Sequence, residues 1–243
     1  MRPTEQIYAN YTAEDFLVWK TLFNRQLKNL KNKVSSEFMY SLERIDFTVE
    51  AIPDFIQVNK KLNSITGWQL VTVPNISEVD EFFKYLAQKK FTSTCWLRTM
   101  QQLDYLEEPD MFHDVFGHTP LLSNKSYCSF FEAMGKLAIK YIDQKEIILK
   151  LQRLYWFTIE FGLIREKGEI KIFGAGIISS KEETEHAISK LSLKTDFNID
   201  KIITHDFRTD ILQNEYYVID SFEQLSDCLK QFELELESEA SVK

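Results

Sequence analysis

The chain has 243 residues, a net charge of −8 at pH 7 and a pI near 5.2. Its length suits one large domain with its own core or two small domains. A hydrophobic content of 44% is ordinary for a soluble globular protein. The acidic balance argues against nucleic-acid binding and against adhesion to anionic lipid, because both need a basic face. We therefore expect a soluble protein without nucleic-acid or membrane partners.

Cysteine use and the N-terminal segment indicate a cytoplasmic protein. Cys95, Cys128 and Cys228 are odd in number, widely spaced and form no CxxC pair. This pattern argues against a disulfide framework or a zinc ribbon and fits a reducing compartment. The first residues lack the apolar stretch of a signal peptide, and no apolar run approaches the ~20 residues that span a bilayer.

In the first half of the chain, hydrophobic spacing predicts helices separated by short extended segments. Thr12 suits a helix N-cap, Asp15 follows three residues later, and apolar residues then recur at i, i+3 and i+4 up to Leu30. The run 68–73 is rich in β-formers and stops at Pro74, which predicts a short strand. Further helices are predicted over 38–45, over 54–62 and from the cap Ser77 to about 88, with a second extended segment over 91–97.

The second half predicts long helices and a few late strands. With only 7 glycines and 5 prolines, and no repeat or linker-like stretch, the chain should form one domain. Its class is predicted to be α+β, with a mainly helical body and a few short strands. Helices are predicted from Ser123 or Ser126 to about 141, within 144–162, over 181–191 and over 221–234, strands over 169–173 and 215–219, and a frayed tail over 235–243.

Two histidines lie five residues apart beside an expected helix break. Pro109 suits the first position of a helix that carries His113, and Gly117 is a natural helix end before His118. On a continuous α-helix, residues i and i+5 are about 140° apart and do not share one metal ion comfortably. We therefore predict that the helix ends at Gly117 and that the chain returns His118 toward His113. The same spacing excludes the HExxH motif of zinc proteases, which needs histidines at i and i+4.

Glu160 is the third candidate ligand. It lies in the apolar run 154–163, so its surroundings are predicted to be buried, and a buried carboxylate needs a cationic partner. Two imidazoles and one carboxylate are the ligand set of non-haem Fe(II) sites with open positions for O2 chemistry. His186 and His205 lie in polar stretches and are interpreted as surface or loop residues. The alternative is structural: helix-end capping by the two clustered histidines and a salt bridge from Glu160 to Arg98, Arg153 or Arg165.

Three motifs follow one another along the chain: Pro109-Asp-x-x-His-Asp-x-x-Gly-His-x-Pro, Tyr155-Trp-Phe-Thr-Ile-Glu-Phe-Gly, and Phe173-Gly-Ala-Gly-Ile-Ile-Ser-Ser. Together they resemble the catalytic domain of the pterin-dependent aromatic amino acid hydroxylases, most closely the short bacterial phenylalanine 4-monooxygenases. The likeness runs from about residue 11 to about residue 232. It implies one catalytic domain over 1–243 with its core in 11–232, no regulatory domain and no tetramerisation tail. We accordingly expect a monomer or a weak dimer.

The resemblance implies a role for each matching residue. His113, His118 and Glu160 match the ligands of Fe(II). Arg98 matches the arginine that binds the substrate carboxylate, since its fork can donate two parallel hydrogen bonds. Asp110 matches the acid that orients this arginine. Trp156 and Ser179 match substrate-pocket residues, Asp114 and Tyr155 match positions that face the tetrahydropterin, and Pro74, Asn75 and Ile76 match the pterin-holding loop.

Two of these residues depart from the family pattern. Asn75 stands where the family usually has glycine, and Asp114 stands where animal enzymes have the longer Glu. Asn tolerates left-handed backbone, so the turn is compatible with the change. A contact from the shorter Asp114 to the pterin would run through water.

The resemblance implies a monooxygenase that uses O2, Fe(II) and a reduced pterin to hydroxylate the ring of an aromatic amino acid, foremost phenylalanine to tyrosine. Tyrosine, tryptophan or several aromatic amino acids are alternative substrates, because enzymes that act on them share these motifs. Two other classes stay open. His113-Asp114 also occurs in HD-type metal-dependent hydrolases, although the further ligands of such enzymes cannot be placed here. A non-catalytic binding protein stabilised by a metal ion is the other.

Overall fold

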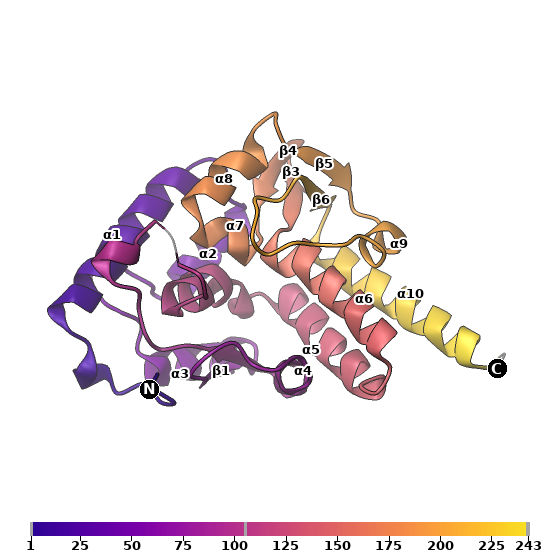
Figure 1. Ribbon diagram of the computed structural model, residues 1–243, viewed down its shortest axis with the longest axis horizontal. Coiled ribbons are helices and arrows are strands. Elements are labelled where there is room, and N and C mark those ends of the chain that lie inside the picture. Colours follow the sequence, from indigo (N-terminus) through magenta and orange to yellow (C-terminus); the bar gives the residue numbers. More distant parts are fainter. Residues whose placement is uncertain (1, 105, 242–243) are drawn as a thin grey trace.

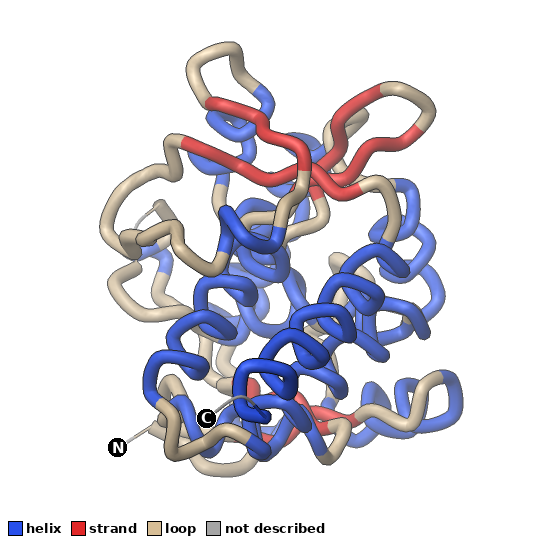
Figure 2. The backbone as a smooth tube through the Cα atoms, turned by 90° about the vertical axis from the view of Figure 1, so that its right-hand side faces the viewer, coloured by secondary structure: helices blue, strands red, loops and turns tan. Residues whose placement is uncertain are grey.

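Helices form the body of the molecule, and two small sheets lie at opposite ends of it (Figures 1 and 2). The computed structural model describes residues 2–104 and 106–241. The predicted α+β class with a mainly helical body is confirmed. The longer helices are α1 (Ala13–Leu30), α2 (Ser36–Arg44), α3 (Phe55–Ile65), α4 (Val79–Ala87), α5 (Lys125–Lys140), α6 (Lys145–Tyr155), α8 (Lys181–Ile188) and α10 (Phe222–Ser241). Shorter helical segments are η1 (Tyr8–Asn10), η2 (Met100–Gln102), η3 (Phe112–His118), η4 (Pro120–Ser123), η5 (Trp156–Glu160), α7 (Ala175–Ser179) and α9 (Ile199–Ile202).

The larger sheet follows directly on η5. Its strand order is β4-β3-β6-β5, and the smaller sheet pairs β1 with β2 in parallel. β3 and β4 form an antiparallel hairpin closed by Lys167 and Gly168, both with the positive φ that a two-residue I′ turn requires. The predicted strands over 169–173 and 215–219 are confirmed, whereas β3 and β5 were missed. The strands are β1 (Gln69–Thr72), β2 (Lys90–Ser93), β3 (Leu163–Glu166), β4 (Glu169–Ile172), β5 (Leu193–Asp196) and β6 (Glu215–Ile219).

The first helix, α1, begins at the predicted cap and packs against η3. The Thr12 hydroxyl accepts the Asp15 amide at 3.3 Å, and the Asp15 carboxylate accepts the Thr12 amide at 2.7 Å, which together form a capping box. Farther along α1, the Trp19 ring meets Phe112 edge-on with centroids 5.6 Å apart. Phe112 stacks in turn on Phe116, one turn along η3. The apolar face of η3 therefore packs against α1, and the two histidines of η3 lie on another side of the helix.

The segment that carries both histidines is a π-helix, and the predicted helix end at Gly117 is wrong. η3 begins at Phe112 rather than at Pro109, and it continues through Gly117 to His118. In a π-helix the backbone hydrogen bonds join residues i and i+5, so residues five apart lie one above the other. His113 and His118 therefore share a face of an unbroken helix. A second π-helix, η5, follows α6 and ends at Glu160.

Two glycines allow α7 to approach both π-helices. A Cβ on Gly117 would lie 3.0 Å from the carbonyl oxygen of Ala175 in α7. A Cβ on Gly174 would lie 2.5 Å from the carbonyl oxygen of Glu160. Both distances are too short for any larger residue without movement of the backbone. The Phe173-Gly-Ala-Gly motif is thus a packing surface that brings α7 next to the ends of η3 and η5.

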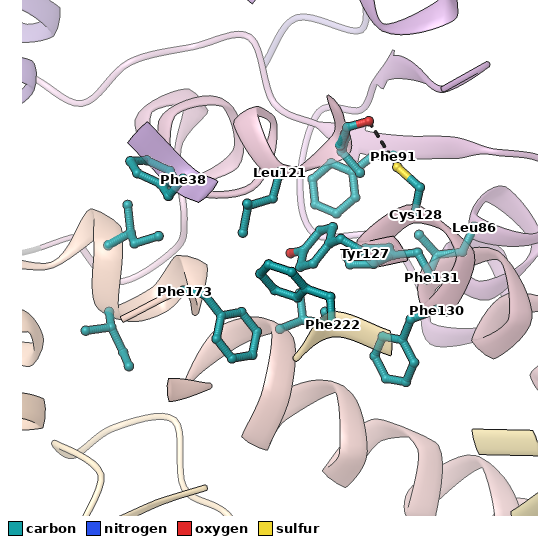
Figure 3. Packing of buried hydrophobic residues seen from close by; sticks show 14 of the residues in the cluster. Phe38, Leu86, Phe91, Leu121, Tyr127, Cys128, Phe130, Phe131, Phe173 and Phe222 are labelled. Carbon is teal, nitrogen blue, oxygen red and sulfur yellow. Dashed lines mark hydrogen bonds between the residues drawn. The ribbon is translucent and has the colours of Figure 1, made fainter. Parts of the chain in front are cut away.

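A chain of aromatic rings connects the core to one histidine. Figure 3 shows Tyr127 and Phe131 of α5 between Phe91 of β2 and Phe222 of α10. The ring centroid of Tyr127 lies 5.7 Å from that of Phe222 and 4.8 Å from that of Phe131. The centroids of Phe131 and Phe91 lie 6.1 Å apart. Phe91 then meets the ring of His118 at 4.8 Å. The position of His118 is therefore set by packed rings as well as by its own backbone.

Two predicted N-caps are wrong. Glu78 rather than Ser77 precedes α4, and no side chain caps that helix. Asn124 caps α5 through its side-chain oxygen, not Ser123 or Ser126. Asn is as good a cap as Ser, so residue type alone could not choose between neighbouring positions.

The C-terminal helix is longer than expected, and the predicted fraying of 235–243 is wrong for the part of the tail that the structure describes. α10 continues to Ser241. Lys140 of α5 forms ion pairs with Glu233 at 3.0 Å and with Glu237, while Leu236 is 6% exposed. Packing against α5 stabilises a segment that composition alone indicated to be polar. Residues 242 and 243 lie outside the described residues.

None of the described helices is long and apolar enough to cross a membrane. All three cysteines are free thiols, and Cys95 and Cys128 are buried. Burial raises the pKa of Cys95 to about 11 and that of Cys128 to about 12, so both stay protonated at neutral pH. The prediction that the chain has no disulfide framework is consistent with this.

Candidate active site

Three side chains from the two π-helices meet at one point. One ligand atom each of His113, His118 and Glu160 lies within 4.8 Å of the others. Nε2 of His118 is 3.1 Å from Nε2 of His113 and 3.1 Å from Oε1 of Glu160. Nε2 of His113 is 3.6 Å from Oε2 of Glu160. The structure thus brings together the three residues that the sequence singled out, by helical winding rather than by the predicted helix break.

Ser179 of α7 fixes the ring of His113. Its hydroxyl donates to the carbonyl of Ala175 at 2.8 Å, so its oxygen is left to accept from Nδ1 of His113 at 2.9 Å. A hydrogen on Nδ1 leaves the lone pair of His113 on Nε2, the atom that points at His118 and Glu160. This is the arrangement in which a second residue orients a metal-binding histidine.

The second imidazole is buried, with unused bonding capacity. The His118 side chain is 2% exposed, and among the described residues its Nδ1 has no hydrogen-bond partner. Its ring lies between Phe91 and the nearly parallel ring of Tyr155, 6.4 Å away. Two imidazole lone pairs that face one another at 3.1 Å repel unless a proton or a cation lies between them.

The ionisation of the group suits a cation. Burial lowers the pKa of His113 to about 4, so this imidazole is neutral at neutral pH. Burial alone would raise the pKa of Glu160, but attraction to His118 and His113 outweighs it and lowers the pKa to about 2. A neutral imidazole and a carboxylate are the forms that bind metal ions. The His113 and Glu160 side chains remain 19% and 12% exposed, so the group is open on one side.

Glu160 does not form the salt bridge to an arginine that was the structural alternative to metal binding. Each arginine that the sequence offered as its partner is bound to another acid: Arg98 to Asp110, Arg153 to Asp206, and Arg165 to Asp196 and Asp220. The carboxylate of Glu160 faces the two histidines instead, and it also interacts with the side chain of Tyr155. Two imidazoles and a carboxylate, converging with one side exposed, fit a divalent metal with open coordination positions.

Asp110 is fully buried and connects Arg98 to His113. Its Oδ2 accepts from Nε and from the backbone amide of Arg98, both at 2.9 Å, and its Oδ1 accepts from Nη2 at 2.8 Å. Oδ1 also accepts the backbone amide of His113 at 3.4 Å. One carboxylate therefore fixes the guanidinium relative to the first histidine. The Nη1 side of the fork remains directed away from Asp110, where it can meet another acceptor.

Trp156 and Tyr155 lie where α6 passes into η5. The Trp156 ring packs against Phe161 and Phe207, with both pairs of centroids 4.6 Å apart. The Tyr155 ring meets Phe82 of α4 edge-on at 5.3 Å. The Tyr155 ring lies 6.4 Å from that of His118, beside the three-residue group, and Trp156 begins the π-helix that ends at Glu160.

Asp114 contacts the end of β2 directly. Its Oδ2 accepts the backbone amide of Thr94 at 2.7 Å and the Thr94 hydroxyl at 2.9 Å. Burial raises the pKa of Asp114 to about 7, although the hydrogen bonds from Thr94 oppose this shift. The carboxylate thus ties η3 to the segment that follows β2.

The segment from Pro74 to Ile76 is held by Trp96 and Arg2. The Trp96 indole donates to the carbonyl of Pro74 at 3.3 Å, and Arg2 donates to Oδ1 of Asn75 at 2.9 Å. The guanidinium of Arg2 also covers the Trp96 ring at 3.9 Å. Asn75 is not among the residues with positive φ, so the family's glycine is not required by the backbone at this position.

Four residues that contact the site were not marked by the sequence. Thr94 binds Asp114, Phe82 packs on Tyr155, Phe207 stacks on Trp156, and Gln213 accepts from the Trp156 indole. Each lies in a different segment from its partner and belongs to no motif. Only the folded chain places them there.

A family model described as biopterin-dependent aromatic amino acid hydroxylase matches residues 2–243. The chain belongs to this family. Phenylalanine-4-hydroxylase of Chromobacterium violaceum is 44% identical over 218 residues, which is 89% of this chain and 73% of the relative. Tyrosine 3-monooxygenase of Canis lupus familiaris is 31% identical over 240 residues, which is 97% of this chain and 48% of the relative.

A solved structure agrees with this assignment. The crystal structure of the C. violaceum phenylalanine hydroxylase with bound oxidised Fe(III) superimposes with a TM-score of 0.89 at 42% identity. The match covers 94% of this chain and 83% of that one. The hydroxylase family that the three motifs resembled is therefore confirmed.

The Arg98 and Asp110 pair yields a stability prediction. Asp110→Ala leaves a guanidinium that is 10% exposed without its partner and should lower the free energy of unfolding by about 3–5 kcal/mol. Chemical denaturation measures this change. As a control, Asp210→Ala removes the partner of the exposed Arg208 and should leave the unfolding curve nearly unchanged. An Asp110 variant as stable as the parent would show that Arg98 is held by other contacts.

Proposed function

We propose that the protein is an Fe(II)-dependent and tetrahydropterin-dependent monooxygenase that hydroxylates the ring of phenylalanine to give tyrosine. The observation that carries this proposal is the convergence of His113, His118 and Glu160 in a chain of the biopterin-dependent hydroxylase family. The C. violaceum phenylalanine hydroxylase, related over most of its length, holds iron in its crystal structure.

In this proposal, His113, His118 and Glu160 hold Fe(II). His113 presents Nε2 because Ser179 occupies its Nδ1, and Glu160 supplies the negative charge. The protein occupies only three positions, so the open side is available to O2 and water. Bound iron and reduced pterin together supply the electrons that activate O2 for insertion into the ring.

We propose that Arg98 and Trp156 hold the amino acid. Asp110 uses Nε and one Nη2 hydrogen of Arg98, so the remaining Nη1 and Nη2 hydrogens can form the bidentate bond to a substrate carboxylate. Trp156, one π-turn before Glu160, offers a flat apolar wall for the aromatic ring. We assign Ser179 to the substrate pocket as well, with its hydroxyl already engaged by His113.

We propose that the pterin binds between the segment from Pro74 to Ile76 and the Tyr155 ring. Tyr155 and Phe82 provide aromatic surface beside His118, which suits a flat heterocycle. Asp114 lies on the same π-helix as both histidines. Because its Oδ2 is bonded to Thr94, its other oxygen would approach the pterin through water.

Tyrosine is the second candidate substrate. The relative from Canis lupus familiaris is a tyrosine 3-monooxygenase and is 31% identical to this chain. Tryptophan and broad specificity stay open as predictions. An HD-type hydrolase is disfavoured, because Asp114 is bonded to Thr94 and the metal-ligand group of the described residues contains His113, His118 and Glu160.

We also propose that residues 1–243 act as one catalytic domain in the cytoplasm. The free thiols of Cys95, Cys128 and Cys228 suit a reducing compartment. A monomer or weak dimer is proposed from the sequence alone. Size-exclusion chromatography with light scattering tests it.

We expect His113→Ala, His118→Ala and Glu160→Ala each to abolish iron binding and hydroxylation while helical content stays near native. Each variant removes one of three ligands and leaves a site too poor to hold Fe(II). Metal analysis after anaerobic loading, circular dichroism, and chromatography of products from phenylalanine, tyrosine and tryptophan give the three readouts. His205→Ala, outside the group, should keep its iron. Full turnover by any ligand variant would refute the assignment.

Arg98→Lys should raise KM for the amino acid about ten- to a hundredfold, the value of one charge-assisted hydrogen-bond pair. A lysine ammonium cannot bind Asp110 and a substrate carboxylate with the geometry of the fork. Steady-state kinetics measures KM for the amino acid and for the pterin separately. Arg165→Lys is the control, since its surface ion pairs lie on the larger sheet. An unchanged KM in Arg98→Lys would remove Arg98 from the substrate site.

A further inference from the structure

Gln213 joins three parts of the chain behind Trp156. It lies just before β6 and is 6% exposed. Its Oε1 accepts the indole Nε1–H of Trp156 at 3.1 Å. Its Nε2 donates to the carbonyls of Arg208 at 2.9 Å and Ile211 at 3.1 Å. Every polar atom of this side chain is therefore engaged.

These partners leave the amide one orientation. The Trp156 indole can only donate, and the carbonyls of Arg208 and Ile211 can only accept. If the amide were flipped, its NH2 group would face the indole N–H of Trp156 and its oxygen would face the two carbonyls, so no hydrogen bond would form. The oxygen of Gln213 is thus fixed toward Trp156 by its own loop.

The backbone of Gln213 is held equally firmly, by α8. Its amide donates to Oε1 of Glu183 at 3.2 Å, and its carbonyl lies 3.0 Å from Nε2 of His186. Glu183 is 5% exposed and also accepts the Tyr216 hydroxyl. A buried carboxylate and a histidine from one helix therefore anchor the residue that touches Trp156.

Stacking alone does not fix Trp156. Phe161 and Phe207 contact its ring, with centroids 4.6 Å away and interplanar angles of 40° and 21°. Such contacts define the plane of the indole but tolerate sliding and rotation within that plane. The directional hydrogen bond from Nε1 to Gln213 removes this freedom. Because Gln213 is itself held by its hydrogen bonds, it keeps the indole edge of Trp156 in one position.

We infer that Gln213 is a positioning residue for the amino acid substrate, acting through Trp156 to fix the wall against which the substrate ring lies. The inference rests on the proposed role of Trp156 in the pocket. Loss of the hydrogen bond should weaken binding of the amino acid without changing binding of the pterin, which lies on the Tyr155 side.

Two substitutions of Gln213 separate positioning from folding. Gln213→Leu removes every side-chain hydrogen bond and should raise KM for phenylalanine about three- to tenfold, the value of one neutral hydrogen bond. KM for the pterin should not change. Gln213→Glu keeps an oxygen acceptor for the indole and should give a KM for phenylalanine between those of Gln213→Leu and the parent. Its second oxygen faces the carbonyls of Arg208 and Ile211, so its stability should fall.

A readout independent of catalysis is the indole N–H resonance of Trp156 in NMR spectra, assigned by its absence in Trp156→Phe. In the parent and in Gln213→Glu this proton should be protected from hydrogen exchange, and in Gln213→Leu it should exchange faster. Gln6→Leu is the matched control. Gln6 also donates to two oxygens and accepts one N–H, on loops that do not touch Trp156. That variant should leave KM and the Trp156 signal unchanged.

The outcomes distinguish this inference from the proposed function. If the parent hydroxylates none of the three aromatic amino acids, the proposed function fails, while the Trp156 signal still tests the hydrogen bond. If the parent is active and Gln213→Leu keeps its KM for phenylalanine, positioning through Gln213 is overturned. An equal KM rise in Gln6→Leu would overturn it too, because general loosening would then explain the effect.

Discussion

The structure depends on keeping the metal-binding atoms of His113, His118 and Glu160 close together at a site that is open on one side. The two imidazoles gain little from their proximity to each other without a cation between them, so the surrounding elements must supply the constraint. Both helices that carry the three residues are π-helical, a form that is rare and therefore less favourable than the α-helix, and such turns are frequent at functional sites. Packing by α1 and α7 offsets that cost.

Buried acids organise the surroundings of the group. Asp110 connects Arg98 with His113, Asp114 ties η3 to Thr94, and Glu183 anchors Gln213 behind Trp156. Each accepts two or more hydrogen bonds, so removal of any of them would leave buried donors unsatisfied. The surface ion pairs, such as Arg208 with Asp210, are exposed and contribute little to this order.

Features that depend on residues close together in the sequence could be predicted from it. The Thr12 capping box, the apolar spacing of α1 and the strand at β6 follow from residue type and period. The candidate ligands could be selected from their types and neighbours, yet the reason that they converge could not. An α-helix was assumed for η3, whereas tertiary packing of Phe112 and Gly117 selects the wider helix.

Contacts between segments that are distant in the chain could not be predicted from the sequence. β3 and β5 are short strands, of which β3 pairs with β4 and β6 and β5 pairs with β6. Gln213 and Phe207 lie in a loop without any motif, and only the fold places them on Trp156. The C-terminal helix continues because Lys140 and the core of α5 hold a segment that is polar by composition.

The most direct test of the three-ligand site is X-ray absorption on protein loaded anaerobically with Fe(II). The account predicts a single ferrous centre of oxygen and nitrogen neighbours in which the scattering pattern of two imidazoles is resolved. A centre with no imidazole, or with sulfur from the cysteines, would contradict it.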